Sequence, residues 1–301
     1  MNVTTGHKPV LIKEVLLYLD PQPGKIYVDV TLGGGGHTRA ILLKEQECKV
    51  IGLDWDKKVI DSTALALQEE FPDRFFPIYG NFAKIYELLN RNGFKKVDGI
   101  LADFGTSQIQ IKNTPGFSFS NDSFLDMRFS SGMYRLTAYK VVNFFKEQRL
   151  AEIFFEYGDE SRGRKIARAI IERRKTKRIE TTKELAALIS DMTPGSYHKI
   201  HPATKVFQAL RIFVNEELDN IKSFLTNSMN VLALDGRLVC ISFHSLEDRL
   251  VKTFFKEKSN PNLNNIYFEM ITKGACKASE EEIIRNRSAR SARLRAGILR
   301  N

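Results

Sequence analysis

The chain has 301 residues, and its composition of 43% hydrophobic and 27% charged residues is that of a globular protein with a buried core. No run of 18 apolar residues and no apolar leader occurs, so we expect a cytoplasmic protein with no membrane span. Cys48, Cys240 and Cys276 are an odd number at unrelated spacings, which argues against a disulfide framework or a zinc site; Cys48 and Cys240 are expected to be packed as small hydrophobes.

A glycine-rich turn between two predicted strands is the most informative feature of the first hundred residues. Residues 26–30 predict a buried strand, four glycines follow at 33–36, and residues 38–43 predict a helix. A second strand at 49–53 ends at Asp54, about 18 residues after the last glycine. This order is typical of a nucleotide-binding βαβ unit, in which glycines admit the ligand and the acid accepts hydrogen bonds from ribose hydroxyls.

The spacing departs from the dinucleotide pattern G-x-G-x-x-G. Asp29 lies inside the first strand and His37 ends the glycine run, which favours S-adenosylmethionine over NAD. A turn that only reverses the chain is the simpler alternative, but it does not explain the acid at the end of the second strand.

Strands and helices continue to alternate along the chain, which predicts a parallel sheet with right-handed crossovers. Asp103 follows the fourth strand directly, as Asp54 follows the second. The further expected strands are 75–79, 99–102, 237–243 and 266–271, and the further expected helices are 57–70, 82–90, 216–234 and 246–257.

Between Asp103 and about residue 202 the pattern becomes helical, with helices predicted at 137–157, 162–175 and 182–192. Thr181 and Glu184 form a capping-box pattern that opens the last of these. Roughly 100 residues are too many for one crossover connection. We therefore expect an α/β domain of residues 1–105 and 211–301 and an inserted helical domain of residues 106–210.

The formal net charge of +10 is concentrated in two runs. Residues 162–183 hold ten Lys or Arg against two acids, and six arginines but no acid lie beyond residue 284. Such clusters are the electrostatic footprint of a protein that binds a nucleic-acid backbone. A solvated helix face is the alternative, and a membrane surface is less favoured because neither run has a matching aromatic face.

Three side chains follow predicted strands at the edge where open α/β sheets bind ligands. Asp54 is expected to bind a ribose, and Phe82 offers a flat apolar ring to an adenine, unless it is a core residue at a helix start. Asp103 is expected to approach the ammonium group of a cofactor or the substrate, with a helix N-cap as the alternative.

His201 and the segment that contains Ser242, His244 and Asp248 invite a nucleophilic-serine interpretation. A triad is recognised by geometry and not by adjacency in sequence. We expect His244 and Asp248 instead to shape the pocket after the fifth strand.

Many segments resemble, in one order, the bacterial 16S ribosomal RNA (cytosine-1402-N4)-methyltransferase family. They are HKPVL at 7–11, DVTLGGGGHT at 29–38, GLDWD at 52–56, GILADFG at 99–105, GFSF at 116–119, LDMR at 125–128, HPATKVFQALR at 201–211, VNEEL at 214–218, SFHSLEDR at 242–249 and RSARLR at 290–295. The resemblance implies a class I (Rossmann-like) methyltransferase fold with an inserted helical domain that recognises RNA. It also implies transfer of a methyl group from S-adenosylmethionine to a cytidine amine in the decoding region of the small ribosomal subunit. The methyl group sits on a sulfonium, so we expect an in-line displacement that needs no metal.

Carried over by position, the resemblance implies a cofactor site of seven residues: Gly35, Gly36, His37, Asp54, Phe82, Asp103 and Gln110. The family pattern DxGVSSPQLD reads DFGTSQIQIK at 103–112, so this loop departs from the family at Thr106, Gln108, Ile109 and Lys112.

Asp103 is the expected catalytic residue, because a cytosine amine is a poor nucleophile that needs a hydrogen-bond acceptor to orient it. The target base must leave its stack to reach the pocket, and Phe104, Phe117 and Phe119 are candidate stacking partners, with simple packing as the alternative. Two other classes remain open: a non-catalytic RNA-binding factor, and an NAD(P)-dependent oxidoreductase, which the glycine spacing disfavours. The sequence does not determine the oligomeric state.

Overall fold

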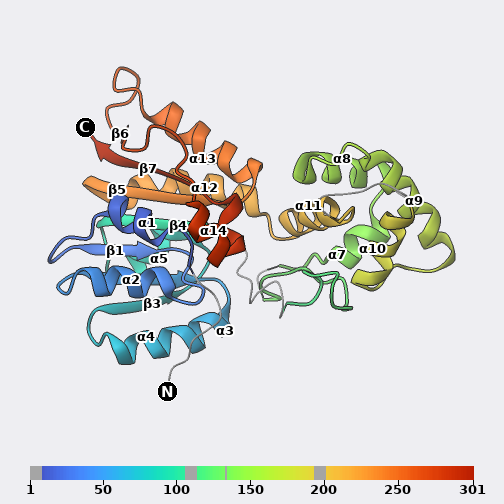
Figure 1. Ribbon diagram of the computed structural model, residues 1–301, viewed down its shortest axis with the longest axis horizontal. Helices are drawn as coiled ribbons and strands as arrows, with labels where there is room; N and C mark the ends of the chain where they lie inside the picture. Colours follow the sequence, from blue (N-terminus) through green and yellow to red (C-terminus); the bar gives the residue numbers. More distant parts are fainter. Residues whose placement is uncertain (1–8, 106–113, 133, 193–200) are drawn as a thin grey trace. The chain divides into compact units, whose positions relative to one another are not determined.

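The computed structural model describes residues 9–105, 114–132, 134–192 and 201–301. The chain divides into two compact units (Figure 1): unit 1 comprises Met1–Ser107 and Leu218–Asn301, and unit 2 comprises Gln108–Glu217. The predicted boundary between residues 210 and 211 falls inside helix α11 (Thr204–Val214), and the units instead divide after Glu217. The whole of α11 therefore belongs to unit 2.

Unit 1 contains a seven-stranded sheet of order β3-β2-β1-β4-β5-β7-β6, which confirms the expected α/β fold class. Strands β1 to β5 pair in parallel, and β7 pairs antiparallel with both β5 and β6. The strands are β1 (Ile26–Asp29), β2 (Lys49–Asp54), β3 (Phe75–Tyr79), β4 (Val97–Phe104), β5 (Leu232–Ser242), β6 (Tyr267–Met270) and β7 (Arg293–Arg300).

Strand β7 was not anticipated from the sequence. Leu294 and Ala296 alternate with Arg293 and Arg295 and are buried in one core, and Leu299 is buried in the core on the opposite face. Two neighbours in the sheet and this alternation make β7 an interior strand.

Helices cover both faces of the sheet, so each parallel strand is apolar on both sides. Val28 of β1 and Ile51 of β2 pack with α5, α12 and α13 in one core, whereas Tyr27 and Val50 pack with α1, α2 and α4 in the other. The helical segments of unit 1 are α1 (Ile12–Leu19), α2 (Gly36–Lys44), α3 (Lys57–Val59), the π-helix Ile60–Ala64, α4 (Leu65–Glu70), the 3-10 turn Phe82–Lys84, α5 (Ile85–Arg91), α12 (Glu217–Val231), α13 (Ser245–Lys258), α14 (Glu280–Arg285) and the 3-10 turn Arg287–Ser291.

Two predicted helices of unit 1 differ in the structure. The helix expected at 57–70 contains the π-helical stretch, and the one expected at 216–234 ends at Val231, where β5 begins at once. Asp235 adopts a φ of 64°, and the register between β4 and β5 shifts beside it. The bulge lets the chain enter the sheet before Asp235, inside the range predicted as helix.

In unit 2, an irregular segment over the described residues from 114 to 137 precedes α7 (Ala138–Phe144), α8 (Glu147–Gly158), α9 (Gly163–Thr176), α10 (Thr182–Asp191) and α11, which pack around one apolar core. The segment predicted as a single helix at 137–157 breaks at Phe145 and Lys146, both extended. The predicted capping box is confirmed, because Thr181 and Glu184 each bind the backbone of the other.

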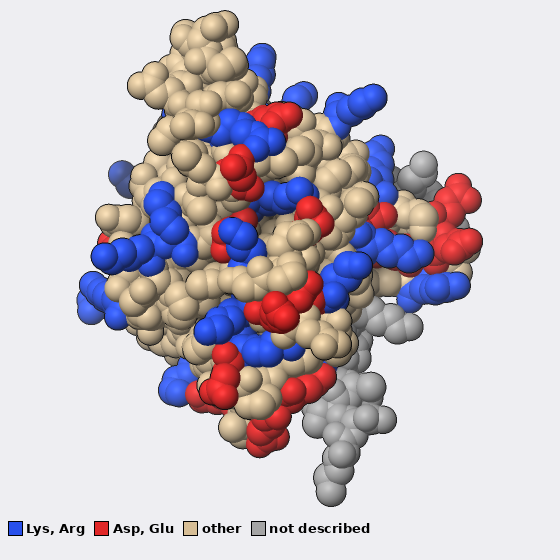
Figure 2. All heavy atoms as spheres, turned by 90° about the vertical axis from the view of Figure 1, so that its left-hand side faces the viewer, with Lys and Arg blue, Asp and Glu red and all other residues tan. Residues whose placement is uncertain are grey.

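No helix in the described part of the chain is long and apolar enough to cross a membrane. Cys48 and Cys240 are buried in the cores, as expected, and all three cysteines are free thiols. The face of the molecule shown in Figure 2 intermingles basic and acidic side chains, so the net positive charge does not form a single-sign patch on that face.

Candidate functional site

The sheet of unit 1 changes direction beside β1, which lies between β2 and β4 although β2 and β3 precede β4 in the chain. In an open α/β sheet this switch point opens a crevice beyond the carboxyl ends of the strands. The glycine-rich turn, Asp54, Phe82 and Asp103 all follow or end strands at this edge, as predicted.

Gly35, in the glycine-rich turn, is the N-cap of helix α2 and has a left-handed backbone conformation. Gly33 and Gly35 have φ values of 49° and 72°, a region that favours glycine. A Cβ on Gly35 would lie 2.8 Å from Leu67, and one on Gly36 would lie 2.7 Å from Pro9. The structure thus supplies a packing reason for these two glycines, because their missing side chains let the turn lie against neighbouring segments of unit 1.

Asp54 holds the turns that follow β1 and β2. Its two carboxylate oxygens accept the backbone N–H groups of Gly33 and Asp56, each at 2.9 Å. Burial raises the pKa of Asp54 to about 6, against the lowering effect of these two hydrogen bonds. Each carboxylate oxygen has a further lone pair, so the residue can still accept a ligand hydroxyl.

A buried polar network joins β1, α2 and β4 beneath the turn. The Asp29 carboxylate, 1% exposed, accepts hydrogen bonds from the Thr38 hydroxyl at 2.8 Å and from the Thr31 backbone at 3.2 Å. The backbone N–H of Asp103 in turn donates to the Thr31 hydroxyl at 2.8 Å. Asp29 therefore fixes the backbone from which the Asp103 side chain projects.

His37 and Asp103 face each other over this network, with His37 Nε2 3.5 Å from Asp103 Oδ2. Burial by itself would lower the pKa of His37, but the carboxylates of Asp103 and Asp29 outweigh it and raise that pKa. Among the described residues, Asp103 Oδ1 and both ring nitrogens of His37 are buried without a hydrogen-bond partner. Buried polar atoms are normally satisfied, so these atoms point to a polar ligand at this place.

Phe82 belongs to an aromatic cluster in the core. Its ring centroid lies 5.3 Å from Trp55, 5.9 Å from Phe104 and 5.7 Å from Phe224. Phe104 is 3% exposed and packs in the same core cluster, and Phe82 is 8% exposed. Half-buried Trp55, directly after Asp54, is an aromatic at this edge that the sequence reasoning missed.

Helix α12 anchors the turn that carries Phe82. Asn81 Nδ2 donates to Asn220 at 2.9 Å, and Asn227 Nδ2 donates to the Ala83 carbonyl at 2.8 Å. Neither asparagine of α12 could be placed here from sequence spacing, because both lie more than 130 positions from the turn that they hold.

The segment after β5 is a helix start. His244 is the N-cap of α13, and its side chain and that of Glu247 cap each other's backbone N–H groups. Buried Asp248 pairs with Arg293 at 3.1 Å and with Arg295 at 2.8 Å, and these arginines hold the pKa of the carboxyl below its usual range although burial alone would raise it. His244 and Asp248 thus tie α13 to its own start and to β7, and no serine triad forms among these described residues.

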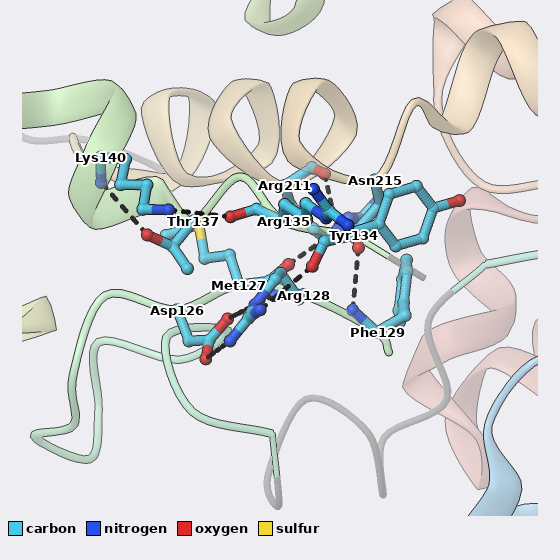
Figure 3. Close-up of polar contacts among 10 residues, drawn as sticks. All are labelled: Asp126, Met127, Arg128, Phe129, Tyr134, Arg135, Thr137, Lys140, Arg211 and Asn215. Atoms are coloured by element: carbon cyan, nitrogen blue, oxygen red, sulfur yellow. Dashed lines mark hydrogen bonds and ion pairs between the residues drawn. The ribbon is translucent and has the colours of Figure 1, made fainter. Parts of the chain in front are cut away.

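In unit 2, Asn215 joins two segments that lie far apart in the sequence (Figure 3). Its Oδ1 accepts the backbone N–H of Phe129 at 2.8 Å, and its Nδ2 donates to the carbonyls of Met127 at 2.7 Å and Arg211 at 2.9 Å. Asn215 is fully buried, so these bonds lock the loop at residues 127–129 onto the end of α11.

Arg128 closes the same loop from the other side. It forms a double hydrogen bond with Asp126, at 2.6 and 2.9 Å, and donates to the Tyr134 carbonyl at 3.0 Å. The LDMR and VNEEL segments thus form one structural element that shapes unit 2.

Replacing Asn215 with Ala is expected to destabilise unit 2 by about 3 kcal/mol, because buried backbone groups at Met127 and Phe129 lose their partner. Urea unfolding measures the loss, and exposed Asn92→Ala, expected within about 0.5 kcal/mol of wild type, is the control. Equal stabilities of the two variants would contradict the locking role.

The basic run at 162–183 lies in and after α9, and part of it is structural. Arg174 donates to the Val142 carbonyl, Arg173 to the Lys177 carbonyl, and Lys175 pairs with Glu172. Arg164 and Lys165 are exposed at the start of the helix. Half of the C-terminal arginines lie in β7, where they pair with acids of unit 1, so that run is not a free basic tail.

Phe117, Phe119 and His201 also belong to unit 2. Phe119 stacks on His201 at 4.4 Å and packs edge-on against Phe207, and Phe117 contacts Phe129 at 5.0 Å. Gln110 and the departures at residues 106, 108, 109 and 112 lie outside the described residues.

The chain is similar to known proteins over nearly its whole length. The family model of the MraW methylase family matches residues 4–298. The Ribosomal RNA small subunit methyltransferase H of Carboxydothermus hydrogenoformans is 45% identical over 97% of each chain, and that of Sulfurihydrogenibium sp. is 44% identical over 97% of this chain and 98% of its own. A solved rRNA methylase from Streptococcus thermophilus aligns over 98% of both chains, with a TM-score of 0.45 and 8% identity. On the family model and the identity to these relatives, the chain belongs to the MraW methylase family.

Proposed function

We propose that this chain is a cytoplasmic S-adenosylmethionine-dependent methyltransferase that acts on N4 of a cytidine, position 1402, of 16S rRNA in the small ribosomal subunit. Membership of a methylase family and identities above 40% to proteins named for small-subunit rRNA methylation support the reaction and the substrate class. The structural observation that supports this function is Asp103 Oδ1, a buried acceptor that has no hydrogen-bond partner among the described residues.

The cofactor would lie along the edge formed by the residues predicted for it. Asp54 would accept hydrogen bonds from the ribose, the backbone of Gly35 and Gly36 would line the start of α2, and Phe82 with Trp55 would flank the adenine. Gln110 stays a proposed contact on the resemblance alone. When bound, S-adenosylmethionine supplies an electrophilic methyl group on a sulfonium, and the residues of the chain need only orient the acceptor amine beside it.

Asp103 would accept a hydrogen bond from the cytidine N4–H through Oδ1 and so direct the nitrogen lone pair at the methyl group. His37 lies beside its other oxygen, and the raised pKa of the imidazole favours its cationic form there.

Cofactor affinity is expected to fall as the pH decreases below about 6. Only the ionised Asp54 is a strong acceptor for the ribose, and its raised pKa means that it takes up a proton near pH 6 in the free protein. With this pKa, calorimetric dissociation constants should rise about fivefold from pH 6 to pH 5. Residue 54 cannot titrate in the Asp54→Asn variant, so any pH dependence of its cofactor dissociation constant comes from other groups such as His37 and Asp29. If the wild type shows the same pH dependence as this variant, Asp54 is not the titrating group.

Methyl transfer from radiolabelled S-adenosylmethionine to deproteinised RNA, small subunits and whole ribosomes, followed by nucleoside analysis, tests the proposed function. We expect N4-methylcytidine in small-subunit RNA. Binding of the cofactor without transfer to any of the three would indicate a non-catalytic RNA-binding factor, and a different modified nucleoside would refute the proposed target atom.

Unit 2 would recognise the RNA, partly through the exposed start of α9. Replacing Arg164, Lys165 and Arg168 with Gln should reduce the slope of log affinity against log salt by about 0.7 for each phosphate that the variant no longer binds. Lys57, Arg91 and Lys222 of unit 1, changed together to Gln, remove the same charge and are the control. Equal slopes for the two triple variants would show that only net charge matters.

A further inference from the structure

One surface of unit 2 carries exposed aromatic rings that the core does not require. Phe124 and Phe144 are 47% and 56% exposed. Half-buried Tyr139 connects them, with ring centroids 5.1 Å from Phe124 and 6.1 Å from Phe144. Single exposed hydrophobic residues are ordinary, but a contiguous group of aromatic rings marks a binding surface.

Arg178 completes this group, which we call the aromatic face (Phe124, Tyr139, Phe144 and Arg178). Its guanidinium lies 5.0 Å from the ring centroid of Phe144, and its Nη1 is 3.4 Å from the Tyr139 hydroxyl. A guanidinium over an aromatic ring is attracted by the ring and keeps its remaining N–H groups for an anion.

Buried hydrogen bonds hold the aromatic face in place. Phe124 forms an antiparallel bridge with Thr181, and the next residue, Leu125, donates to the Glu180 carbonyl at 3.0 Å. Asn143 binds both backbone groups of Ile179, at 3.0 and 2.7 Å. The segments that carry the rings and Arg178 are therefore preorganised, which lowers the entropic cost of binding a ligand.

The charge around the face favours an anionic ligand. The segments that carry it, residues 122–124, 139–144 and 174–184, hold six Lys or Arg against three acids. Glu184 is engaged, because Lys177 and the capping box bind its carboxylate and lower its pKa to about 2. The core of a protein-protein interface is depleted in such charges, whereas aromatic rings with cations fit the bases and phosphates of single-stranded RNA.

We propose that the aromatic face binds single-stranded RNA of the substrate, with bases stacking on Phe124 and Phe144 and Arg178 contacting a phosphate. This inference rests on the proposed function for the identity of the RNA, but it assigns the contact to residues outside the cofactor edge. It requires unpaired bases, whereas the contact proposed for the start of α9 requires only phosphates.

The test replaces Phe124 and Phe144 together with Leu, which keeps apolar surface but removes the flat rings. Phe155→Leu is the matched control, because Phe155 is 67% exposed on α8 of the same unit. Dissociation constants of the full-length protein would be measured for a fluorescent single-stranded RNA of the target region and for the same sequence fully base-paired. Calorimetry with S-adenosylmethionine and thermal unfolding show that each variant is folded.

We expect the double variant to bind the single-stranded RNA at least about tenfold more weakly, with duplex affinity and cofactor affinity unchanged. Its KM for RNA should rise while kcat is retained, and Arg178→Gln should reduce the salt slope by about 0.7. Phe155→Leu should match wild type in all of these measurements.

RNA binding by the double variant equal to that of Phe155→Leu would overturn the inference while leaving the proposed function intact. Loss of self-association in light scattering with unchanged RNA affinity would assign the face to a second copy of the chain and overturn it as well. A wild-type protein that binds the cofactor but neither binds nor methylates RNA would refute both proposals.

Discussion

Replacing Asp103 with Ala is expected to lower kcat by about 10²- to 10³-fold, with only a small change in cofactor affinity. The backbone of Asp103 is fixed by Thr31, and its Oδ1 is a buried acceptor with no partner among the described residues. Such an atom can orient a poorly nucleophilic amine, whose hydrogen bond strengthens as positive charge develops on nitrogen in the transition state. Single-turnover kinetics with calorimetric cofactor binding separate the two quantities.

Asp98→Ala is the control for Asp103, since Asp98 lies in the same strand but at its amino end, where it pairs with Lys25 at 2.9 Å. This variant should keep kcat. If Asp103→Ala binds the cofactor much more weakly but keeps its kcat, Asp103 contacts the cofactor and not the substrate. If both values stay near those of wild type, Asp103 has no role in the site.

Replacing Asp54 with Ala is expected to raise the dissociation constant of S-adenosylmethionine roughly 10- to 150-fold. A buried ribose hydroxyl would lose a charged acceptor, a loss of about 1.5–3 kcal/mol. The substitution also releases the N–H groups of Gly33 and Asp56, so the glycine-rich turn becomes less ordered. Calorimetric titration of the purified protein measures the change.

Asp56→Ala serves as the comparison, because Asp56 lies two positions away and only caps α3 through the backbone of Lys58. We expect it to bind the cofactor within a few-fold of wild type. If folded Asp54→Ala binds as tightly as Asp56→Ala, Asp54 does not contact the cofactor.

The sequence by itself determined the features that depend on local periodicity and on chain order. Alternating apolar runs predicted the parallel strands β1 to β4, because a strand buried on both faces reads as a continuous apolar segment. The same order placed Asp54, Phe82 and Asp103 at one edge, since parallel strands align their carboxyl ends. The capping box at Thr181 was readable for the same reason, as its partners lie three residues apart.

Only the tertiary structure decided which distant groups meet. The hydrogen bond from Thr38 to Asp29, the support of Asp103 by Thr31, and the anchoring of the Phe82 turn by α12 all depend on packing between separate elements. The C-terminal arginines looked like a basic tail, but pairing of β7 with β5 and β6 buries the residues between them and directs Arg295 onto Asp248. Charge and composition are local properties of a sequence, whereas sheet pairing and burial are set by residues far apart in the chain. Sheet pairing and burial decide which partner a side chain finds.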